Sequence, residues 1–208
     1  MSVLNHLASS LNRRDEIPNQ QLAKQIVEKN DLKSVKKLAE NLNNKDKNIQ
    51  SDCIKVLYEI GERNPSLIAS YAKEFIALLE NKNNRLVWGA MTALDYIASE
   101  NPKIIFKALV KIIDVADKGS VITNDHAVNI LIKLSALKEY SGKTFPLLLE
   151  RLETCPTNQL PMYAENSVPI INDENKNNFV IIISSRLKEV EKKSKKKRIE
   201  KVIKKLTK

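Results

Sequence analysis

A repeat of 37 residues constrains this chain more than any other feature of its sequence. The segments 62–68 and 99–105 are near copies, and their prolines, Pro65 and Pro102, are 37 positions apart. The same offset aligns a column of small residues and two columns of aliphatic residues: Cys53, Ala90, Ala127 and Ala164; Leu57, Leu94, Leu131 and Val168; Ile60, Ile97, Leu134 and Ile171. Within each copy these positions are spaced i, i+4 and i+7, which places them on one face of a helix. The pattern predicts stacked helical repeats.

Each copy also contains an earlier helix with its own apolar positions, such as Val35 and Leu38 in one copy and Phe75 and Leu79 in the next. We call the earlier helix of each repeat helix A and the later one helix B. Asn-Pro pairs at 64–65 and 101–102 predict a capping Asn followed by Pro at the first helical position of helix A. The chain has only 4 Gly and 7 Pro, too few for the many tight turns of a β fold, so we expect an all-α protein.

The segment Arg85–Ala98 resembles the second helix of a HEAT repeat, and Asn48–Gly61 is similar. The resemblance extends over residues 30–175 and implies a right-handed α-α superhelix, or solenoid, of about five to six helical hairpins whose B helices line the concave side. One feature departs from the family. HEAT repeats often place an arginine after a valine-like residue, where it pairs with an aspartate in a neighbouring repeat. Here the corresponding residues are Gln50, Val87, Asn124 and Pro161.

The ends of the array are less regular. Leu4, Leu7, Ala8 and Leu11 suggest a first helix, and Pro18 a second. Pro161 and Pro169 predict a short or kinked helix B in the fourth repeat. We therefore expect a repeat solenoid over residues 1–191 and a basic capping helix over residues 192–208.

The positive charge of the chain is concentrated at its C-terminal end. The whole chain carries a net charge of +10, but residues 186–208 hold twelve Lys and Arg against three Glu, and the remainder is close to neutral. A basic segment followed by an apolar stripe can bind nucleic acid, an anionic membrane surface or an acidic protein. A terminal helix with one apolar and one polar face is also what a repeat array needs as a cap. The candidate anion-binding residues are Lys192, Lys193, Lys195, Lys196, Lys197 and Arg198.

Nothing in the sequence indicates a catalytic centre, a metal site or a cofactor. The chain has two cysteines without CxxC spacing, and its two histidines, His6 and His126, belong to no spaced motif. Asp125 adjoins His126, but adjacent residues do not share a helix face, so we expect His126 to be a surface residue. We expect Cys53 to be a core thiol and Cys155 to be exposed in a polar loop. No signal peptide or membrane-spanning run is visible, which favours a cytoplasmic protein, or a nuclear one in a eukaryote.

Some HEAT-like solenoids resemble alkylpurine DNA glycosylases, which hold damaged DNA in a basic groove with tryptophans and a carboxylate. In that family a Trp and an Asp lie one helical turn apart. Here Thr92 stands four residues after Trp88, the only tryptophan, and the body of the chain is near neutral. Both departures argue against this enzyme.

The most probable function from sequence is therefore a non-catalytic scaffold that binds a protein or peptide on the B helices. Trp88 is a natural anchor for a partner, and the alternative is that it packs over the end of a neighbouring helix. Columns of mixed charge beside it fit a protein better than a polyphosphate. The candidate partner-binding residues are Lys55, Tyr58, Trp88, Thr92, Asp95, Asn129 and Lys133. Nucleic-acid binding by the basic C-terminal helix remains the alternative.

Overall fold

The computed structural model describes residues 2–207, so the outermost residues of the two expected segments, Met1 and Lys208, lie outside it. Every regular element in the described part of the chain is a helix. The chain forms two compact units, Met1–His126 and Ala127–Lys208, and the boundary falls within α8. The α-helices are α1 (Ile17–Lys29), α2 (Leu32–Glu40), α3 (Lys47–Arg63), α4 (Ala72–Leu78), α5 (Asn84–Tyr96), α6 (Pro102–Lys107), α7 (Leu109–Lys118), α8 (Val121–Ser135), α9 (Lys138–Thr154), α10 (Leu160–Ser167), α11 (Lys176–Ser185) and α12 (Lys193–Leu206).

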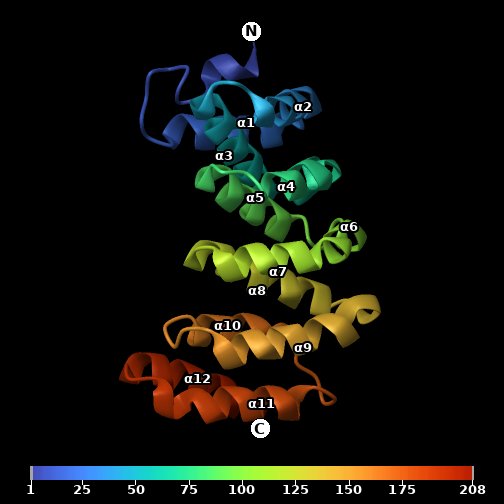
Figure 1. Cartoon of the computed structure of the whole chain (residues 1–208), viewed down its shortest axis with the longest axis vertical. Coiled ribbons are helices and arrows are strands. Elements are labelled where there is room, and N and C mark those ends of the chain that lie inside the picture. Colours follow the sequence, from blue (N-terminus) through green and yellow to red (C-terminus); the bar gives the residue numbers. More distant parts are fainter. Residues whose placement is uncertain (1, 208) are drawn as a thin grey trace. The chain divides into compact units, whose positions relative to one another are not determined.

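In the first unit α1, α3 and α5 follow one another in the stack (Figure 1). Helix α3 packs between α1 and α5, while the A helices α2 and α4 pack against α3 and α5, respectively. The predicted apolar columns form the core here, since Cys53, Leu57 and Ile60 of α3 are completely buried. Their counterparts 37 residues later in α5 are buried as well. The periodicity therefore identified the core face of both helices correctly.

Gly89 allows α5 to approach α3 closely. A Cβ atom at this position would lie 2.5 Å from Cγ1 of Ile54, which is well inside van der Waals contact. Any larger residue at position 89 would push the two B helices apart.

The Asn-Pro pairs begin helical segments, but their asparagines do not cap them. Pro65 begins a 3₁₀ turn (Pro65–Leu67) and Pro102 begins α6, and neither Asn64 nor Asn101 makes a side-chain capping hydrogen bond. Instead, the side chain of Asn101 donates to the carbonyl of Ala69 at 3.3 Å. The prediction that the two asparagines cap these helices is therefore wrong. Asn101 instead links two successive repeats of the first unit.

Less of the N-terminal segment is helical than its apolar residues predicted. Only Val3–His6 forms a 3₁₀ helix, followed by turns. Asn12 adopts a left-handed backbone conformation (φ 53°), and the Arg13 amide donates to the Ala8 carbonyl at 2.9 Å. This pattern terminates a helical turn. Leu11 is consequently left about half exposed.

In the second unit, α9 packs against α10 and α11, and α12 packs against α10 and α11. Helix α10 has only 8 residues and continues as a 3₁₀ turn (Val168–Ile170) that contains Pro169, as its prolines predicted. Val168 and Ile171 are therefore only partly buried, unlike the other members of their columns. No helix among residues 2–207 is long and apolar enough to cross a membrane.

Candidate partner-binding groove

The first unit contains a groove with a volume of about 810 Å³ along its B helices. One wall is the N-terminal turn segment with the start of α1, and the floor is formed by α3, α5 and the first turn of α8. Most of the lining side chains are polar or charged. The lining residues are Ala8, Ser9, Asn12, Arg13, Arg14, Asp15, Glu16, Asn19, Asn48, Ser51, Asp52, Ile54, Lys55, Tyr58, Arg85, Trp88, Gly89, Thr92 and Ile122.

The repeat explains which side chains reach this groove. Helix α5 contributes residues 85, 88, 89 and 92, and α3 contributes the same positions 37 residues earlier (48, 51, 52 and 55) together with Ile54 and Tyr58. Equivalent faces of two successive B helices therefore form the floor. Four of the seven candidate partner-binding residues, Lys55, Tyr58, Trp88 and Thr92, lie in this groove.

Lys55 is held in a network rather than presented as a free charge. Its Nζ atom lies 2.7 Å from Glu16 and 2.9 Å from Glu59, and 4.7 Å from the centroid of the Tyr58 ring. Glu59 also accepts from Arg63 at 2.7 Å. Burial alone would lower the pKa of Lys55, but the hydrogen bonds to Glu16, Tyr58 and Glu59 outweigh it and raise that pKa. Lys55 thus positions Glu16 and Tyr58 at the groove edge.

Glu59 lies below the groove and is almost completely buried. Burial acts to raise the pKa of Glu59, but the hydrogen bonds from Lys55 and Arg63 prevail and hold that pKa below its ordinary value. Glu59 is therefore an anion that fixes two cations on one face of α3.

Two further acidic side chains of the groove, Asp52 on α3 and Asp15 in the N-terminal wall, are also engaged within the protein. Asp52 accepts from the Ser9 amide at 2.8 Å and from the Asn19 side chain at 2.7 Å, and Asn19 in turn accepts from the Ala8 amide at 3.0 Å. Asp15 forms a two-pronged pair with Arg13 at 2.8 and 2.9 Å. These bonds attach the N-terminal turn to α1 and α3. Arg13 also neutralises Asp15, whereas neither donor to Asp52 carries a positive charge.

Two arginines of the groove differ from its other charges. Arg14 and Arg85 are exposed, and their guanidinium groups make no hydrogen bond or ion pair with residues 2–207. Beside them are a partly buried Trp88, whose indole N–H has no protein acceptor in the same range, and Ile122, which is 46% exposed. The groove therefore combines unpaired positive charge with an apolar surface.

His126 is not the surface residue that the sequence led us to expect. Its Nδ1 atom lies 2.8 Å from Oδ2 of Asp95 and its Nε2 atom lies 2.9 Å from Oγ1 of Thr92, and its side chain is only 18% exposed. The side chains that hold the His126 ring, Asp95 and Thr92, lie on α5, in the preceding repeat. Asp95 itself is buried below the groove. It holds the His126 ring, which in turn contacts Thr92.

Thr92, His126 and Asp95 are linked in the order hydroxyl, imidazole, carboxylate, which resembles the catalytic triad of a hydrolase. However, Oγ1 of Thr92 also donates to the Trp88 carbonyl at 2.9 Å. The single hydroxyl hydrogen cannot serve the carbonyl and the imidazole at once. Thr92 is also almost completely buried. We interpret the three side chains as a structural connection between α5 and α8.

The remaining candidate residues belong to the second unit. Asn129 and Lys133 are half-buried on α8, and Asn129 accepts from the Asn166 side chain at 3.3 Å. On α12, Lys195 donates to the Asn158 side chain at 2.6 Å, and Arg198 pairs with Glu165 at 2.8 Å. The hydrogen bond from Arg198 holds the pKa of Glu165 below its ordinary value. Lys196 is half-buried, and the exposed candidates without an ion pair among residues 2–207 are Lys192, Lys193 and Lys197.

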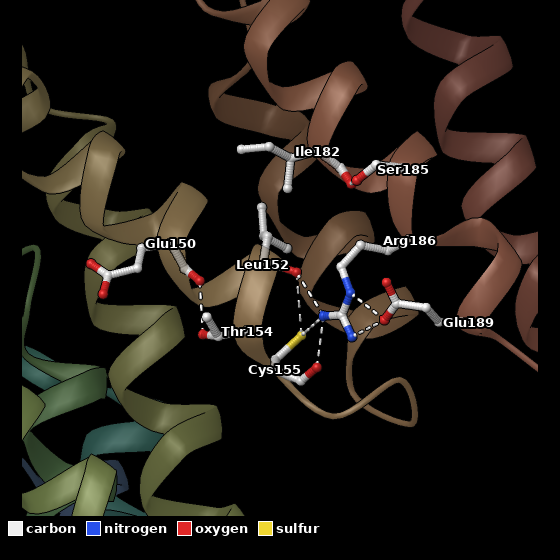
Figure 2. A network of polar contacts seen from close by, with 8 residues as sticks. All are labelled: Glu150, Leu152, Thr154, Cys155, Ile182, Ser185, Arg186 and Glu189. Carbon is white, nitrogen blue, oxygen red and sulfur yellow. Dashed lines mark hydrogen bonds and ion pairs between the residues drawn. The ribbon is translucent and has the colours of Figure 1, made fainter.

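Both cysteines are buried thiols. Cys53 is the core residue that its column predicted, and burial raises its pKa to about 12. Cys155 is not exposed as expected, because Arg186 crosses over it (Figure 2). Nη1 of Arg186 donates to the carbonyls of Leu152 and Cys155 at 3.1 and 2.7 Å, and Nη2 donates to Glu189 at 2.8 Å. Burial raises the pKa of the Cys155 thiol, although Arg186 opposes this shift.

Sequence reasoning missed several groove residues. The repeat offset from Asn48 would have identified Arg85, since the two positions are equivalent. No comparable signal marks Arg14, because the N-terminal turn has no counterpart in the periodic part of the chain. Among residues 2–207, no cluster of three His, Cys, Asp or Glu side chains could hold a metal ion.

The geometry defines the chain as an all-α repeat protein of the solenoid class, and solved structures agree. A designed armadillo repeat protein in complex with the peptide (KR)4 matches with a TM-score of 0.66 at 14% identity, covering 100% of both chains. Computationally designed armadillo repeat proteins for modular peptide recognition match with a TM-score of 0.67 at 13% identity, covering 98% of both chains. No family model and no curated protein sequence matches the chain. At these identities the likeness establishes the fold.

Proposed function

We propose that the protein is a non-catalytic scaffold that binds a segment of another polypeptide in the groove of the first unit. The observation that carries this proposal is the groove itself. It joins equivalent faces of α3 and α5, and it presents Trp88 and Ile122 among unpaired arginines. Aromatic residues and arginine are the side chains most enriched at binding hot spots of proteins.

Two further observations support a polypeptide ligand. Pockets for small molecules are mostly apolar, whereas this lining is mostly polar and charged. Two of the matching solved structures, which share this fold, are a complex with a peptide and proteins designed for peptide recognition. The arrangement of Thr92, His126 and Asp95 supports a non-catalytic role, since the Thr92 hydroxyl is bonded to a backbone carbonyl.

We also propose that the repeats are of the HEAT type. The hairpin of α2 and α3 has the two helices of that family, whereas α6 and α7 divide one helix A near Ala108. Together with α8, these segments form a repeat of three helices, which is the arrangement of an armadillo repeat, the relative of the two-helix HEAT repeat. The two free cysteines support action in a reducing compartment such as the cytoplasm.

The experiment that tests peptide binding uses Trp88 as its probe, because it is the only tryptophan of the chain. Peptides selected from a displayed random library would be synthesised without tryptophan and titrated while Trp88 emission is followed. We expect binding to change the emission, and Trp88→Ala to weaken binding by about tenfold or more. Tyr71→Ala is the control, since it truncates a half-buried aromatic outside the groove. Selected peptides that leave the emission unchanged and bind Trp88→Ala equally well would refute the proposal.

The exposed lysines of α12 support a second candidate, nucleic-acid binding. Lys192, Lys193 and Lys197 are exposed and share no ion pair with residues 2–207. The test compares binding of fluorescent duplex and single-stranded DNA at two salt concentrations. If α12 binds the phosphates, affinity falls steeply with salt and is lost when the three lysines are changed to Gln. Affinity that is insensitive to salt or to these changes excludes this candidate.

A further inference from the structure

We infer that the groove of the first unit recognises an acidic peptide segment, with carboxylates bound by Arg14 and Arg85 and an apolar side chain placed against Trp88 and Ile122. This inference rests on the proposed function and specifies the chemistry of the partner. It depends on which charges of the groove are already paired and which are not.

All three carboxylates that line the groove are engaged within the protein. Asp15 binds Arg13, Glu16 binds Lys55, and Asp52 accepts from Asn19 and from a backbone amide. A basic ligand would therefore find Asp52 as the only lining carboxylate without a cationic partner among residues 2–207, and it would be repelled by Arg14 and Arg85. The lining offers a cationic ligand no carboxylate without a partner.

The two charged side chains of the lining that make neither a hydrogen bond nor an ion pair within residues 2–207 are both positive. Arg14 lies in the wall and Arg85 at the start of α5, and both are exposed. A guanidinium group binds a carboxylate through two parallel N–H···O bonds, which gives both strength and direction. Because the two arginines come from different elements of the groove, a ligand that reaches both must extend between the wall and the floor.

The neighbouring apolar surface adds a second requirement. Ile122 is 46% exposed and lines the groove with Trp88, which is partly buried. An aromatic or aliphatic side chain of the ligand would cover both residues. We therefore expect a segment in which Asp or Glu residues flank at least one large apolar residue.

The same lining argues against a nucleic acid in this groove. A polyphosphate carries a negative charge on every residue, and some of its phosphates would face Asp52, whose hydrogen-bond donors are neutral groups. A peptide with separated carboxylates can pair with Arg14 and Arg85 without that repulsion. This distinction makes the peptide the better fit, and DNA becomes an outcome of the test.

The experiment selects binders from a displayed library of random dodecapeptides on three full-length proteins. These are the wild type, the charge-reversed variant Arg14→Glu/Arg85→Glu, and the control Lys73→Glu/Lys107→Glu. The control makes the same change in net charge at exposed positions outside the groove. We expect Asp and Glu to be enriched about threefold or more over the input library on the wild type and the control, and to lose that enrichment on the charge-reversed variant.

A selected acidic peptide then provides a quantitative test. We expect Arg14→Gln and Arg85→Gln each to weaken its binding by about five- to tenfold. The corresponding peptide with Gln in place of Glu should bind the wild type weakly and lose little more on either variant. Equal losses for the acidic peptide and its Gln version would overturn the inference, because the arginines would not then act through carboxylates.

The outcomes separate this inference from the proposed function. Wild-type binders that depend on Trp88 but show no enrichment of Asp and Glu would overturn the acidic specificity and leave peptide binding intact. Binders that do not depend on Trp88 would refute both the acidic specificity and peptide binding in the groove. A twelve-nucleotide single strand of thymidylate that displaces the acidic peptide at a lower concentration than the peptide itself requires would also overturn the inference, in favour of a polyphosphate ligand.

Discussion

The Nδ1 atom of His126 lies 2.8 Å from Oδ2 of Asp95, and this bond joins α8 to α5 across 31 residues of sequence. Asp95 is buried and the His126 side chain is only 18% exposed. The other ring nitrogen contacts Thr92 in the groove. The groove floor is thus supported from below by a polar connection between two successive repeats.

Removing this connection should destabilise the first unit. We expect Asp95→Ala to lower the free energy of unfolding by about 1–3 kcal/mol, because it leaves a ring nitrogen of His126 without its partner in a partly buried site. Urea denaturation measures the change. Glu100→Ala is the control, since Glu100 is exposed in the turn after α5. If the two variants are equally stable, the bond makes no net contribution.

The network around Glu59 should make stability depend on pH. Its pKa is lower in the folded protein than its ordinary value of 4.5. The folded state therefore binds the proton more weakly, and the stabilisation is present above about pH 4.5 and disappears as the pH falls through the folded pKa. We expect Glu59→Gln to cost about 1–3 kcal/mol at pH 7 and progressively less below pH 4.5.

Urea denaturation across this pH range would follow the effect, with Glu62→Gln as the control. Glu62 lies on the same helix, but it is exposed, and its distance to Arg63 is longer, at 3.7 Å. A cost for Glu59→Gln that stays constant with pH would show that the charge of Glu59 does not contribute.

The packing of the B helices could be predicted from sequence because it depends on local periodicity. Cys53, Ala90, Ala127 and Ala164 occupy one small-residue column, and all four are buried. A position that faces the next helix must be small in every repeat, so the pattern survives in a single sequence. The half-buried Val168 shows the limit of this reasoning, since Pro169 ends the regular helix there.

The groove wall and the buried polar bonds could not be predicted in the same way. The turn at Asn12 depends on a left-handed residue and on Asp52, which lies 43 residues after its partner Ser9. His126 was assigned to the surface because its neighbour Asp125 could not orient it. Its actual partner lies in another repeat, and only the arrangement of the helices brings the two together. Long-range polar contacts leave no periodic signal.

Arg186 should protect Cys155 by holding the end of α9 in place. We expect Arg186→Met to leave the carbonyls of Leu152 and Cys155 without their donor, costing about 1–3 kcal/mol, and to increase the rate of maleimide labelling of Cys155 by about tenfold. The experiment uses a Cys53→Ala background, which the alanines of that column predict to be tolerated.

Lys188→Met is the control for this prediction, since Lys188 is exposed two residues away. Labelling that is equally slow in both variants would show that burial by the surrounding helices suffices to protect the thiol without Arg186.

Helix α12 should stabilise the second unit through its apolar face rather than through its charges. Ile199 is completely buried, whereas the Arg198 and Glu165 side chains are 46% and 38% exposed. We expect Ile199→Ala to cost about 2–4 kcal/mol and to accelerate amide hydrogen exchange in α10 and α11, against which α12 packs. Arg198→Ala should cost less than about 1 kcal/mol, because exposed ion pairs are screened by solvent. Lys197→Ala, at an exposed position, is the control. If Arg198→Ala proves as destabilising as Ile199→Ala, the attachment of α12 is electrostatic, and its stability would then fall with added salt.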